Sequence, residues 1–368
     1  MTDFPPSNAP RDLRGAIVGY GFIAERGHAP AYALPGETRF QIVAIADGCA
    51  ARREKAHAAF PQARIYEGHE QLLEAERGRI DFVDVATPPC DHARVATHAL
   101  SRGLHVLCEK PLATTAADAR RMLARARDSR RVLFPSHNYK HAPVVKAVRR
   151  VLDQGAIGAV RLVTLQTFRT THAKGVDEWR RDWRRERRFS GGGIAMDHGS
   201  HTFYLAFDWL GGYPTSISAK MSTLGVFDTE DNFSCSMTFP HGTASAHLSW
   251  TAGVRKVLYT IHGERGAIRV EDDDVEVAIM KEATSRTASP TVWETHKLSV
   301  SSDWMDASHV GWFRSLFDQF AGAIAREDFV SPETEASLGC VELITAAYES
   351  AFDGSRERLL AARAERAA

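Results

Sequence analysis

The first 140 or so residues alternate short apolar runs with Ala-rich helical patterns, and this alternation leaves few folds open to the chain. The apolar runs hold almost no polar residues, as expected for strands buried on both faces of a parallel sheet. Helices between such strands cover the two faces of the sheet. We therefore predict a doubly wound parallel sheet in an N-terminal domain over residues 1–143, with strands at residues 15–18, 40–46, 81–86, 105–108 and 132–135.

The pattern changes after residue 143. An amphipathic helix over Val144–Gln154 is followed by short strands of alternating polarity, separated by turns such as Pro240-His-Gly242. Consecutive short strands joined by tight turns predict a mainly antiparallel sheet. Helices are expected again at residues 310–326 and 333–353, and residues 354–368 are expected to form a charged, Ala-rich helix or a frayed end. We assign residues 144–368 to a second domain.

Composition excludes several classes of protein. Lys and Arg together number 46, as do Asp and Glu, so no net charge draws the chain to nucleic acid or to an anionic membrane. The five cysteines are scattered without a Cys-x-x-Cys pair, which argues against a zinc site and a disulfide framework. No signal-peptide pattern and no run of 18 apolar residues occurs. We expect a cytoplasmic protein without a metal.

A glycine motif follows the first predicted strand and opens a helix, as Gly19-Tyr-Gly21-Phe22-Ile23-Ala24. This is the G-x-G-x-x-G/A pattern with which Rossmann domains bind dinucleotides. Gly19 permits the tight turn, Gly21 lets the pyrophosphate approach the backbone, and Ala24 keeps the helix close to the strand. We expect these residues, with Phe22 and Ile23 between them, to form the cofactor site.

Asp47 ends the second predicted strand, where an acid binds the ribose hydroxyls of the cofactor. A carboxylate at this place repels a 2′-phosphate, so Asp47 favours NAD over NADP. Arg52 and Arg53 follow closely and keep NADP open as the less favoured cofactor, although we expect both to face solvent on the next helix.

Two later strands end in the segments Thr87-Pro88 and Glu109-Lys110-Pro111. Open α/β sheets bind ligands outside the carboxyl ends of their strands, so we expect these residues to line the cofactor site. Taken alone, Thr87-Pro88 is more typical of a plain strand-terminating turn.

The segment Ser190–His201 holds three consecutive glycines, which we interpret as a turn that lets backbone approach a ligand closely. Asp197 and His201 then stand four residues apart, on one face of a helix. A carboxylate beside an imidazole sets up proton transfer near neutral pH. With the nucleotide motif and Lys110, this pair predicts hydride transfer at a carbon that bears a hydroxyl group.

Residues 179–188 hold six arginines and two acids. One interpretation is that Arg184 and its neighbours bind an anionic substituent of the substrate, such as a phosphate, a nucleotide diphosphate or a carboxylate. The other interpretation is a solvated or subunit-facing segment, as most charge runs are.

These motifs, in this order, resemble the glucose–fructose oxidoreductase/inositol dehydrogenase/MocA (Gfo/Idh/MocA) family. The resemblance runs from about Leu13 to Ala351 and includes Asp91-His92 and Gly155-Ala-Ile-Gly158. It implies an N-terminal Rossmann domain and a C-terminal α/β domain built on a large, open, mainly antiparallel sheet. It also implies an NAD(P) cofactor and homodimers or homotetramers that form through the outer face of this sheet.

The resemblance further implies roles for individual residues. His201 is the general base, Asp197 orients it, and Lys110 stabilises charge on the substrate oxygen. His92 joins the cofactor site. The expected substrate site comprises Lys110, His137, Asn138, Tyr139, Arg184, Asp197 and His201.

The leading hypothesis is an NAD(H)-dependent dehydrogenase or reductase that acts on a secondary alcohol of a sugar, a cyclitol or a derivative. One alternative is an NAD-dependent glycosidase that oxidises its substrate transiently and retains the cofactor. The other is a non-catalytic dinucleotide- or sugar-binding regulator, for which a complete proton relay is unnecessary.

Overall fold

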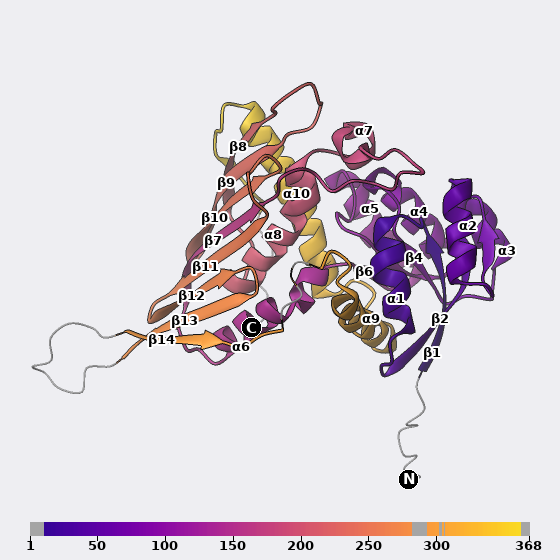
Figure 1. Cartoon of the computed structure of the whole chain (residues 1–368), viewed down its shortest axis with the longest axis horizontal. Helices are drawn as coiled ribbons and strands as arrows, with labels where there is room; N and C mark the ends of the chain where they lie inside the picture. Colours follow the sequence, from indigo (N-terminus) through magenta and orange to yellow (C-terminus); the bar gives the residue numbers. More distant parts are fainter. Residues whose placement is uncertain (1–10, 282–292, 302–303, 305, 362–368) are drawn as a thin grey trace, which may run out of the picture.

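The computed structural model describes residues 11–281, 293–301, 304 and 306–361, which form two sheets with helices between and around them (Figure 1). The parallel sheet lies in the N-terminal part of the chain and the larger, mainly antiparallel sheet in the C-terminal part, as predicted. Within the described ranges, no helix is long and apolar enough to cross a membrane.

The N-terminal sheet is parallel throughout, with the strand order β3-β2-β1-β4-β5-β6. From β1 the chain adds β2 and β3 on one side and then, from β4 onwards, adds strands on the other side. Doubly wound sheets bind ligands outside the carboxyl ends of the strands at the point where the strand order reverses in this way, here between β1 and β4. The short β3 was not predicted, because three residues show no periodicity. The strands are β1 (Arg11–Val18), β2 (Thr38–Ala46), β3 (Arg64–Tyr66), β4 (Phe82–Val85), β5 (His105–Cys108) and β6 (Leu133–Pro135).

Helices cover both faces of this sheet. Ala96, Ala99 and Leu100 of α4 are fully buried in the same apolar cluster as Val83 and Val106 of the sheet. The helical segments are η1 (Ala24–His28), α1 (Ala29–Ala33), α2 (Ala50–Ala59), α3 (His69–Ala75), α4 (Pro89–Ser101), α5 (Ala116–Ser129) and η2 (Asn138–His141).

The C-terminal sheet has the order β14-β13-β12-β11-β7-β10-β9-β8-β15, and only the β7–β10 pair is parallel. Its strands are β7 (Val160–Phe168), β8 (Ser216–Ser222), β9 (Asn232–Phe239), β10 (Gly242–Ser249), β11 (Lys256–Gly263), β12 (Gly266–Glu271), β13 (Asp274–Met280), β14 (Trp293–Leu298) and β15 (Arg358–Leu359).

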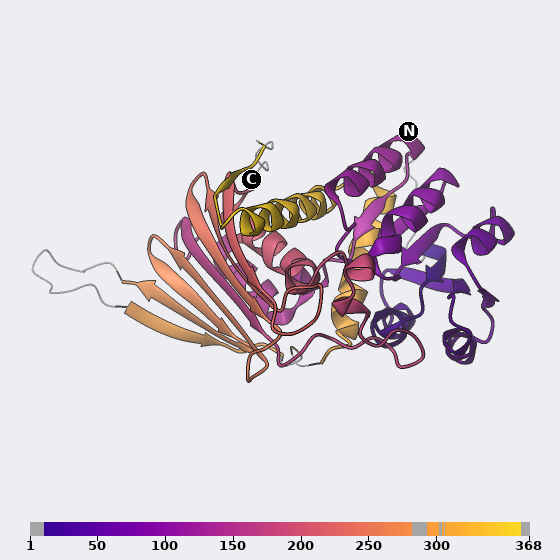
Figure 2. The same ribbon diagram turned by 90° about the horizontal axis from the view of Figure 1, so that it is seen from above.

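Helices α6 (Pro143–Asp153), α8 (Ile194–Leu210) and α10 (Pro332–Phe352) pack on one face of this sheet (Figure 2). Phe233 and Met237 of β9 point into that core, whereas Ser234 and Ser236 point to the opposite face. The short η3 (Trp183–Arg185) and α7 (Arg187–Ser190) lie in the connection between β7 and α8.

Helix α9 (Val310–Ala325) returns from the C-terminal part and packs on the N-terminal domain. Its Phe317 stacks on Tyr32 with ring centroids 4.2 Å apart, and Phe313 packs edge-on against His28. The division between residues 143 and 144 stays a prediction, and α9 ties the two parts together across it.

The tail prediction was wrong for residues 354–361. Gly354 and Ser355 have φ values of 65° and 68°, which end the helical path, and Arg358 and Leu359 pair with β8. Residues 362–368 lie outside the described residues.

Candidate active site

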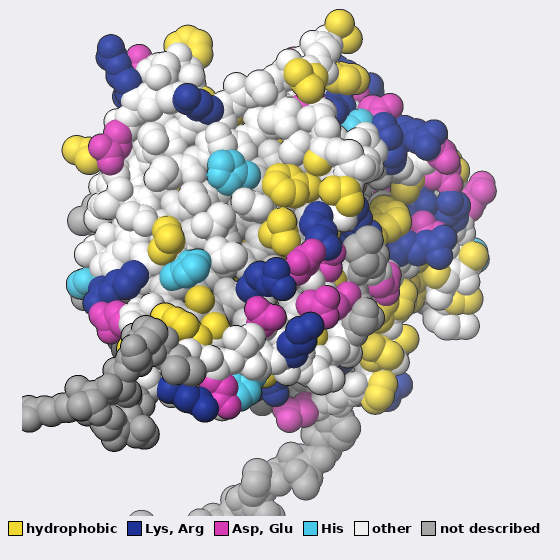
Figure 3. Space-filling model, turned by 60° about the vertical axis from the view of Figure 1, so that its left-hand side comes forward, with side chains coloured by type: hydrophobic (Ala, Val, Ile, Leu, Met, Phe, Trp, Pro, Cys, Tyr) yellow, Lys and Arg dark blue, Asp and Glu magenta, His cyan; other side chains and the backbone are white. Residues whose placement is uncertain are grey.

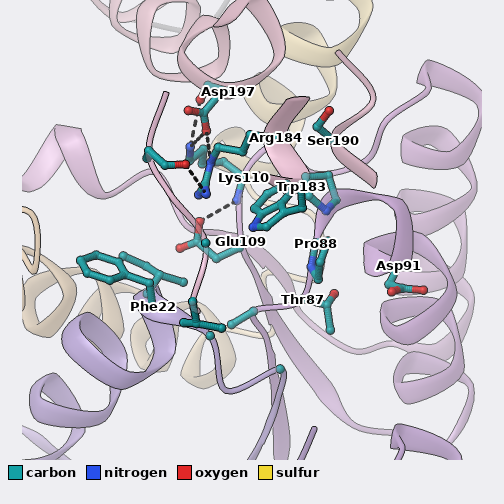
Figure 4. Close-up of a pocket in the computed structure, with 18 of the residues that line it drawn as sticks. Phe22, Thr87, Pro88, Asp91, Glu109, Lys110, Trp183, Arg184, Ser190 and Asp197 are labelled. Atoms are coloured by element: carbon teal, nitrogen blue, oxygen red, sulfur yellow. Dashed lines mark hydrogen bonds and ion pairs between the residues drawn. The ribbon is translucent and has the colours of Figure 1, made fainter. Parts of the chain in front are cut away.

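A cavity of about 820 Å³ runs from the glycine motif, past the carboxyl ends of β2, β4 and β5, to helix α8. Its size falls within the range of small-molecule sites in proteins. Most predicted site residues line it, namely Gly19, Gly21, Phe22, Ile23, Asp47, Thr87, Pro88, Glu109, Lys110, Asn138, Tyr139, Arg184, Asp197 and His201. Figure 4 shows how residues of both domains face this space.

The glycine motif leaves room for a dinucleotide. Gly19 has a φ of 92°, and a Cβ atom there would lie 2.8 Å from the backbone of Ala86 and Thr87. A Cβ atom on Gly21 would meet no atom within 4 Å, so the backbone at Gly21 is open to a ligand. Ala24 is fully buried and does not line the cavity, which fits its expected packing role.

Asp47 is fixed by the backbone around it. Its Oδ2 accepts a 2.7 Å hydrogen bond from the amide of Tyr20, and its Oδ1 accepts one of 2.8 Å from the amide of Cys49. Arg52 does not face solvent as expected: it is buried, donates to the carbonyl oxygen of Tyr20 at 2.6 Å and pairs with Glu25 at 2.7 Å. The Arg52 charge is therefore already satisfied beside the nucleotide turn.

His92 takes a different place from the predicted cofactor contact. It is buried, and its two ring nitrogens lie 2.8 Å from the carbonyl oxygens of Thr87 and Pro111. It thus lies between the two loops that follow β4 and β5, behind the cavity wall, and its one N–H donates to one of the two carbonyl oxygens.

His28, to which the sequence pattern assigns no role, lies at the centre of a buried group of charged side chains. Its Nδ1 lies 2.8 Å from Asp84 Oδ2 and its Nε2 lies 3.2 Å from Glu109 Oε1. Burial alone would lower the pKa of His28, but the two carboxylates outweigh it and raise that pKa to about 10. His28 is therefore an imidazolium that holds Glu109 next to Lys110.

Lys110 and Asp197 meet across the two domains (Figure 4). Lys110 Nζ lies 2.9 Å from the carbonyl oxygen of Asp197 and 3.2 Å from its Oδ1, and Arg184 Nε lies 3.5 Å from the same Oδ1. Burial opposes ionisation of Asp197, but the charges of Lys110 and Arg184 outweigh it and hold its pKa well below the usual value. Asp197 is therefore ionised.

His201 is held by Tyr204 rather than by Asp197, which differs from the expected role of Asp197. The Tyr204 hydroxyl lies 2.8 Å from His201 Nδ1 and also accepts a 3.2 Å bond from the amide of Tyr139. The Tyr139 ring stacks on the imidazole with centroids 3.8 Å apart. Burial, and then the charge of Lys110, lower the pKa of His201 well below its ordinary value, so the imidazole is neutral.

The three consecutive glycines are packed closely against other parts of the protein. A Cβ atom on Gly192 would lie 1.9 Å from the hydroxyl of Tyr348, and one on Gly193 would lie 2.0 Å from the carbonyl oxygen of Glu230. The Glu230 carboxylate also accepts hydrogen bonds of 3.0 Å from the amides of Gly193 and Ala195. The turn is rich in glycine chiefly because side chains there would clash with Glu230 and Tyr348, which pack against the start of α8.

His137 lies behind the predicted substrate site. It is buried, stacks on the Tyr204 ring at 4.1 Å and lies 3.6 Å from Glu333, so it does not line the cavity. Asn138 and Tyr139, which follow it, do line the cavity.

Within the arginine-rich segment, Arg184 lines the cavity, whereas the other arginines do not and pair with acids of this chain. Arg185 pairs with the buried Asp231, and Arg188 pairs with Glu186 at 2.6 Å. Most arginines of the segment are thus ion-paired within this chain and are not directed into the cavity.

Comparison with known proteins agrees with this geometry. Residues 13–137 match the family model described as "Oxidoreductase family, NAD-binding Rossmann fold", and residues 145–269 match the "GFO/IDH/MocA C-terminal domain". The chain belongs to the Gfo/Idh/MocA family. It is therefore an oxidoreductase whose N-terminal Rossmann domain binds NAD, and the predicted family, enzyme class and cofactor are confirmed.

Individual relatives in the Gfo/Idh/MocA family act on sugars and cyclitols. The chain is 26% identical over 351 residues to inositol 2-dehydrogenase of Rhizobium meliloti, with 92% of this chain and 96% of the relative covered. It is 25% identical to levoglucosan dehydrogenase of Pseudarthrobacter phenanthrenivorans, with 77% and 80% covered.

Solved structures show the same fold. A levoglucosan dehydrogenase complex with NADH and levoglucosan superimposes with a TM-score of 0.78 at 21% identity, covering 95% of this chain and 99% of that one. GenD2 from gentamicin A biosynthesis, in complex with NAD, gives a TM-score of 0.78 at 24% identity, covering 98% and 100%.

Proposed function

We propose that the protein is an NAD(H)-dependent dehydrogenase or reductase that acts on a secondary alcohol carbon of a sugar, a cyclitol or a derivative. The observation that carries this proposal is that Lys110 and His201, from separate domains, line one end of a cavity whose other end is the glycine motif. The open backbone at Gly21 and the fixed carboxylate of Asp47 fit the NAD pyrophosphate and ribose.

In the oxidative direction, each side chain has a task. His201 is neutral, so its Nε2 accepts the hydroxyl proton while Nδ1–H donates to the Tyr204 oxygen. Lys110, anchored by Asp197, donates a hydrogen bond to the same substrate oxygen and stabilises developing negative charge there. The nicotinamide, when bound, supplies the hydride acceptor.

The experiment is a screen of sugars, cyclitols and sugar derivatives with NAD⁺, followed at the nicotinamide absorbance. Stoichiometric NADH formation supports the proposal. Turnover of an aryl glycoside without net NADH supports the glycosidase alternative instead. NADH binding with no turnover of any kind supports a binding regulator, although a neutral base beside an anchored lysine argues against that outcome.

We further propose that the substrate carries an anionic substituent. Arg184, the predicted contact, is partly engaged already: it pairs with Asp197, donates to the carbonyl oxygen of Ala173 at 3.1 Å and lies over the Trp183 ring. Arg184 still lines the cavity and can contact an anionic substituent, but its main charged partner is Asp197.

We also propose that the protein forms homodimers or homotetramers through the open face of the C-terminal sheet. This broad face carries mainly uncharged side chains (Figure 3), among them Thr164, Gln166, Ser234, Ser236 and Ser245. Light scattering of the wild type and of Ser236→Glu tests the proposal. A smaller particle for the variant supports it, and a monomeric wild type contradicts it.

A further inference from the structure

Two arginines lie close together where the C-terminal sheet meets the cavity. Arg255 precedes Lys256 of β11 and Arg169 follows Phe168 of β7, and Lys256 and Phe168 are the terminal paired residues of these two antiparallel strands. Like charges held close together on adjacent strands are destabilising. Both arginines line the cavity. Burial and the charge of Arg169 lower the pKa of Arg255, which reflects this repulsion.

Asp272, an acid on the sheet near the two arginines, forms an ion pair with Lys256. Asp272 Oδ2 lies 3.1 Å from Lys256 Nζ, and its Oδ1 accepts a 2.8 Å bond from the amide of Val257. Among the described residues, no carboxylate oxygen lies within 4.0 Å of the Arg169 guanidinium, which donates to the carbonyl oxygen of Phe168 at 2.8 Å. Asp272 raises the pKa of Arg255 and so offsets part of the repulsion, although its ion pair is with Lys256.

The arginine pair lies beside the proton-transfer residues. His198 lines the same cavity, with its Nε2 3.8 Å from Asp197. Burial, and then the charges of Arg169 and Lys110, lower the pKa of His198 to about 3 against the pull of Asp197. His198 is thus affected by the charges of both Arg169 and Lys110, and Arg169, Arg255 and Lys110 all line the cavity that His198 lines.

We propose that Arg169 and Arg255 form a subsite for an oxyanion, a carboxylate or a phosphate, carried by the substrate of the proposed dehydrogenase. Guanidinium groups suit this task because each presents planar donors that match a carboxylate or phosphate in bidentate geometry. A bound oxyanion between them offsets their mutual repulsion. The inference deepens the proposed function and rests on it for the identity of the site as a substrate site.

The test measures oxyanion binding directly, without turnover. Calorimetric titrations of inorganic phosphate and of acetate, at constant ionic strength, use the protein saturated with NADH, so that the pyrophosphate site is filled. We expect at least one ion to bind with millimolar affinity. Arg169→Gln and Arg255→Gln should each weaken that binding at least tenfold, and Arg169→Lys should restore part of it.

The exposed Arg125 on α5 provides the matched control, and Arg125→Gln should bind the ion like the wild type. NADH affinity in each variant reports that the variant is folded. Tighter binding of phosphate indicates a phosphorylated substrate, and tighter binding of acetate indicates a sugar acid. Failure of both ions to bind the wild type, or equal binding by the wild type and both Gln variants, overturns the inference.

The experiments distinguish rejection of the oxyanion subsite from rejection of the dehydrogenase proposal. If the substrate screen finds turnover only of neutral sugars, and the Gln variants leave KM unchanged, the dehydrogenase proposal stands and the oxyanion subsite is rejected. If phosphate or acetate binds as expected but no alcohol reduces NAD⁺, the subsite stands and the dehydrogenase proposal is rejected.

Discussion

The hydroxyl of Tyr204 lies 2.8 Å from Nδ1 of His201, three residues earlier on α8. This hydrogen bond leaves Nε2 as the nitrogen available to a substrate in the cavity. The same Tyr204 oxygen accepts from the Tyr139 amide, so the position of the imidazole is set by the backbone that follows β6 as well as by α8.

Tyr204→Phe removes the hydroxyl and keeps the ring that stacks on His137. We expect kcat to fall about tenfold, because the loss of one net hydrogen bond of roughly 1.4 kcal/mol corresponds to that factor. Steady-state kinetics with the best substrate of the screen measures the effect, and NADH affinity should not change. A kcat equal to that of the wild type would show that Tyr204 does not position His201.

The pH dependence of alcohol oxidation should report the lowered pKa of His201. The base works when it is neutral, so activity should persist below pH 6.5 and fall only as the pH drops through the depressed pKa. Lys110→Met removes the second cause of the shift after burial, so the acid limb of its residual kcat/KM should move to higher pH. An acid limb that does not move, or that moves to lower pH, contradicts the assignment.

The buried His28 predicts a specific dependence of stability on pH. Its pKa is about 10 in the folded protein, above the value of about 6.5 for an unfolded histidine. The stabilisation is therefore fully present below pH 6.5 and is lost as pH rises towards 10. Urea denaturation of the wild type at pH 6 and pH 9.5 should show a larger loss than in His28→Gln. Parallel losses in the two proteins would rule out an imidazolium at this position.

The preference for NAD should depend on Asp47. A side chain fits at the neighbouring Gly48, where a Cβ atom would meet no atom within 4 Å. We expect wild type to bind NADH more tightly than NADPH, and Asp47→Ser with Gly48→Arg to reverse the order, because the change replaces a repulsive carboxylate by a guanidinium. Calorimetry of both cofactors measures this, with Gly48→Arg alone as the control. Equal or tighter NADPH binding by the wild type contradicts the role of Asp47.

The two sheets could be predicted from the sequence, because strands and the glycine turn are encoded by residues that are neighbours in the chain. Local patterns did not predict the partners of buried polar groups, which come from distant segments. Spacing placed Asp197 and His201 on one face of α8, but Lys110 and Arg184 draw the Asp197 carboxylate towards them. The sequence pattern placed Arg52 at the surface, yet Arg52 is buried and its guanidinium is bound by the Tyr20 carbonyl oxygen and the Glu25 carboxylate.

The glycine run and His92 show the same limit. Three glycines in sequence signal a close approach, but only the fold reveals that the approaching groups belong to the protein. The sequence pattern is the same whether the histidine after Thr87-Pro88 faces the ligand or, as here, lies between the loops behind the cavity wall.

In the proposed mechanism, His201 takes the substrate proton while Lys110 stabilises developing negative charge on the substrate oxygen. The most direct measurement is the rate of NADH formation by His201→Ala at saturating substrate and NAD⁺, with NADH affinity measured in parallel. We expect a kcat lower by about 10²–10⁴, the usual contribution of a positioned proton-transfer group, with NADH affinity unchanged. Turnover by His201→Ala at near the wild-type rate would contradict the account and leave Lys110 or His198 as the base.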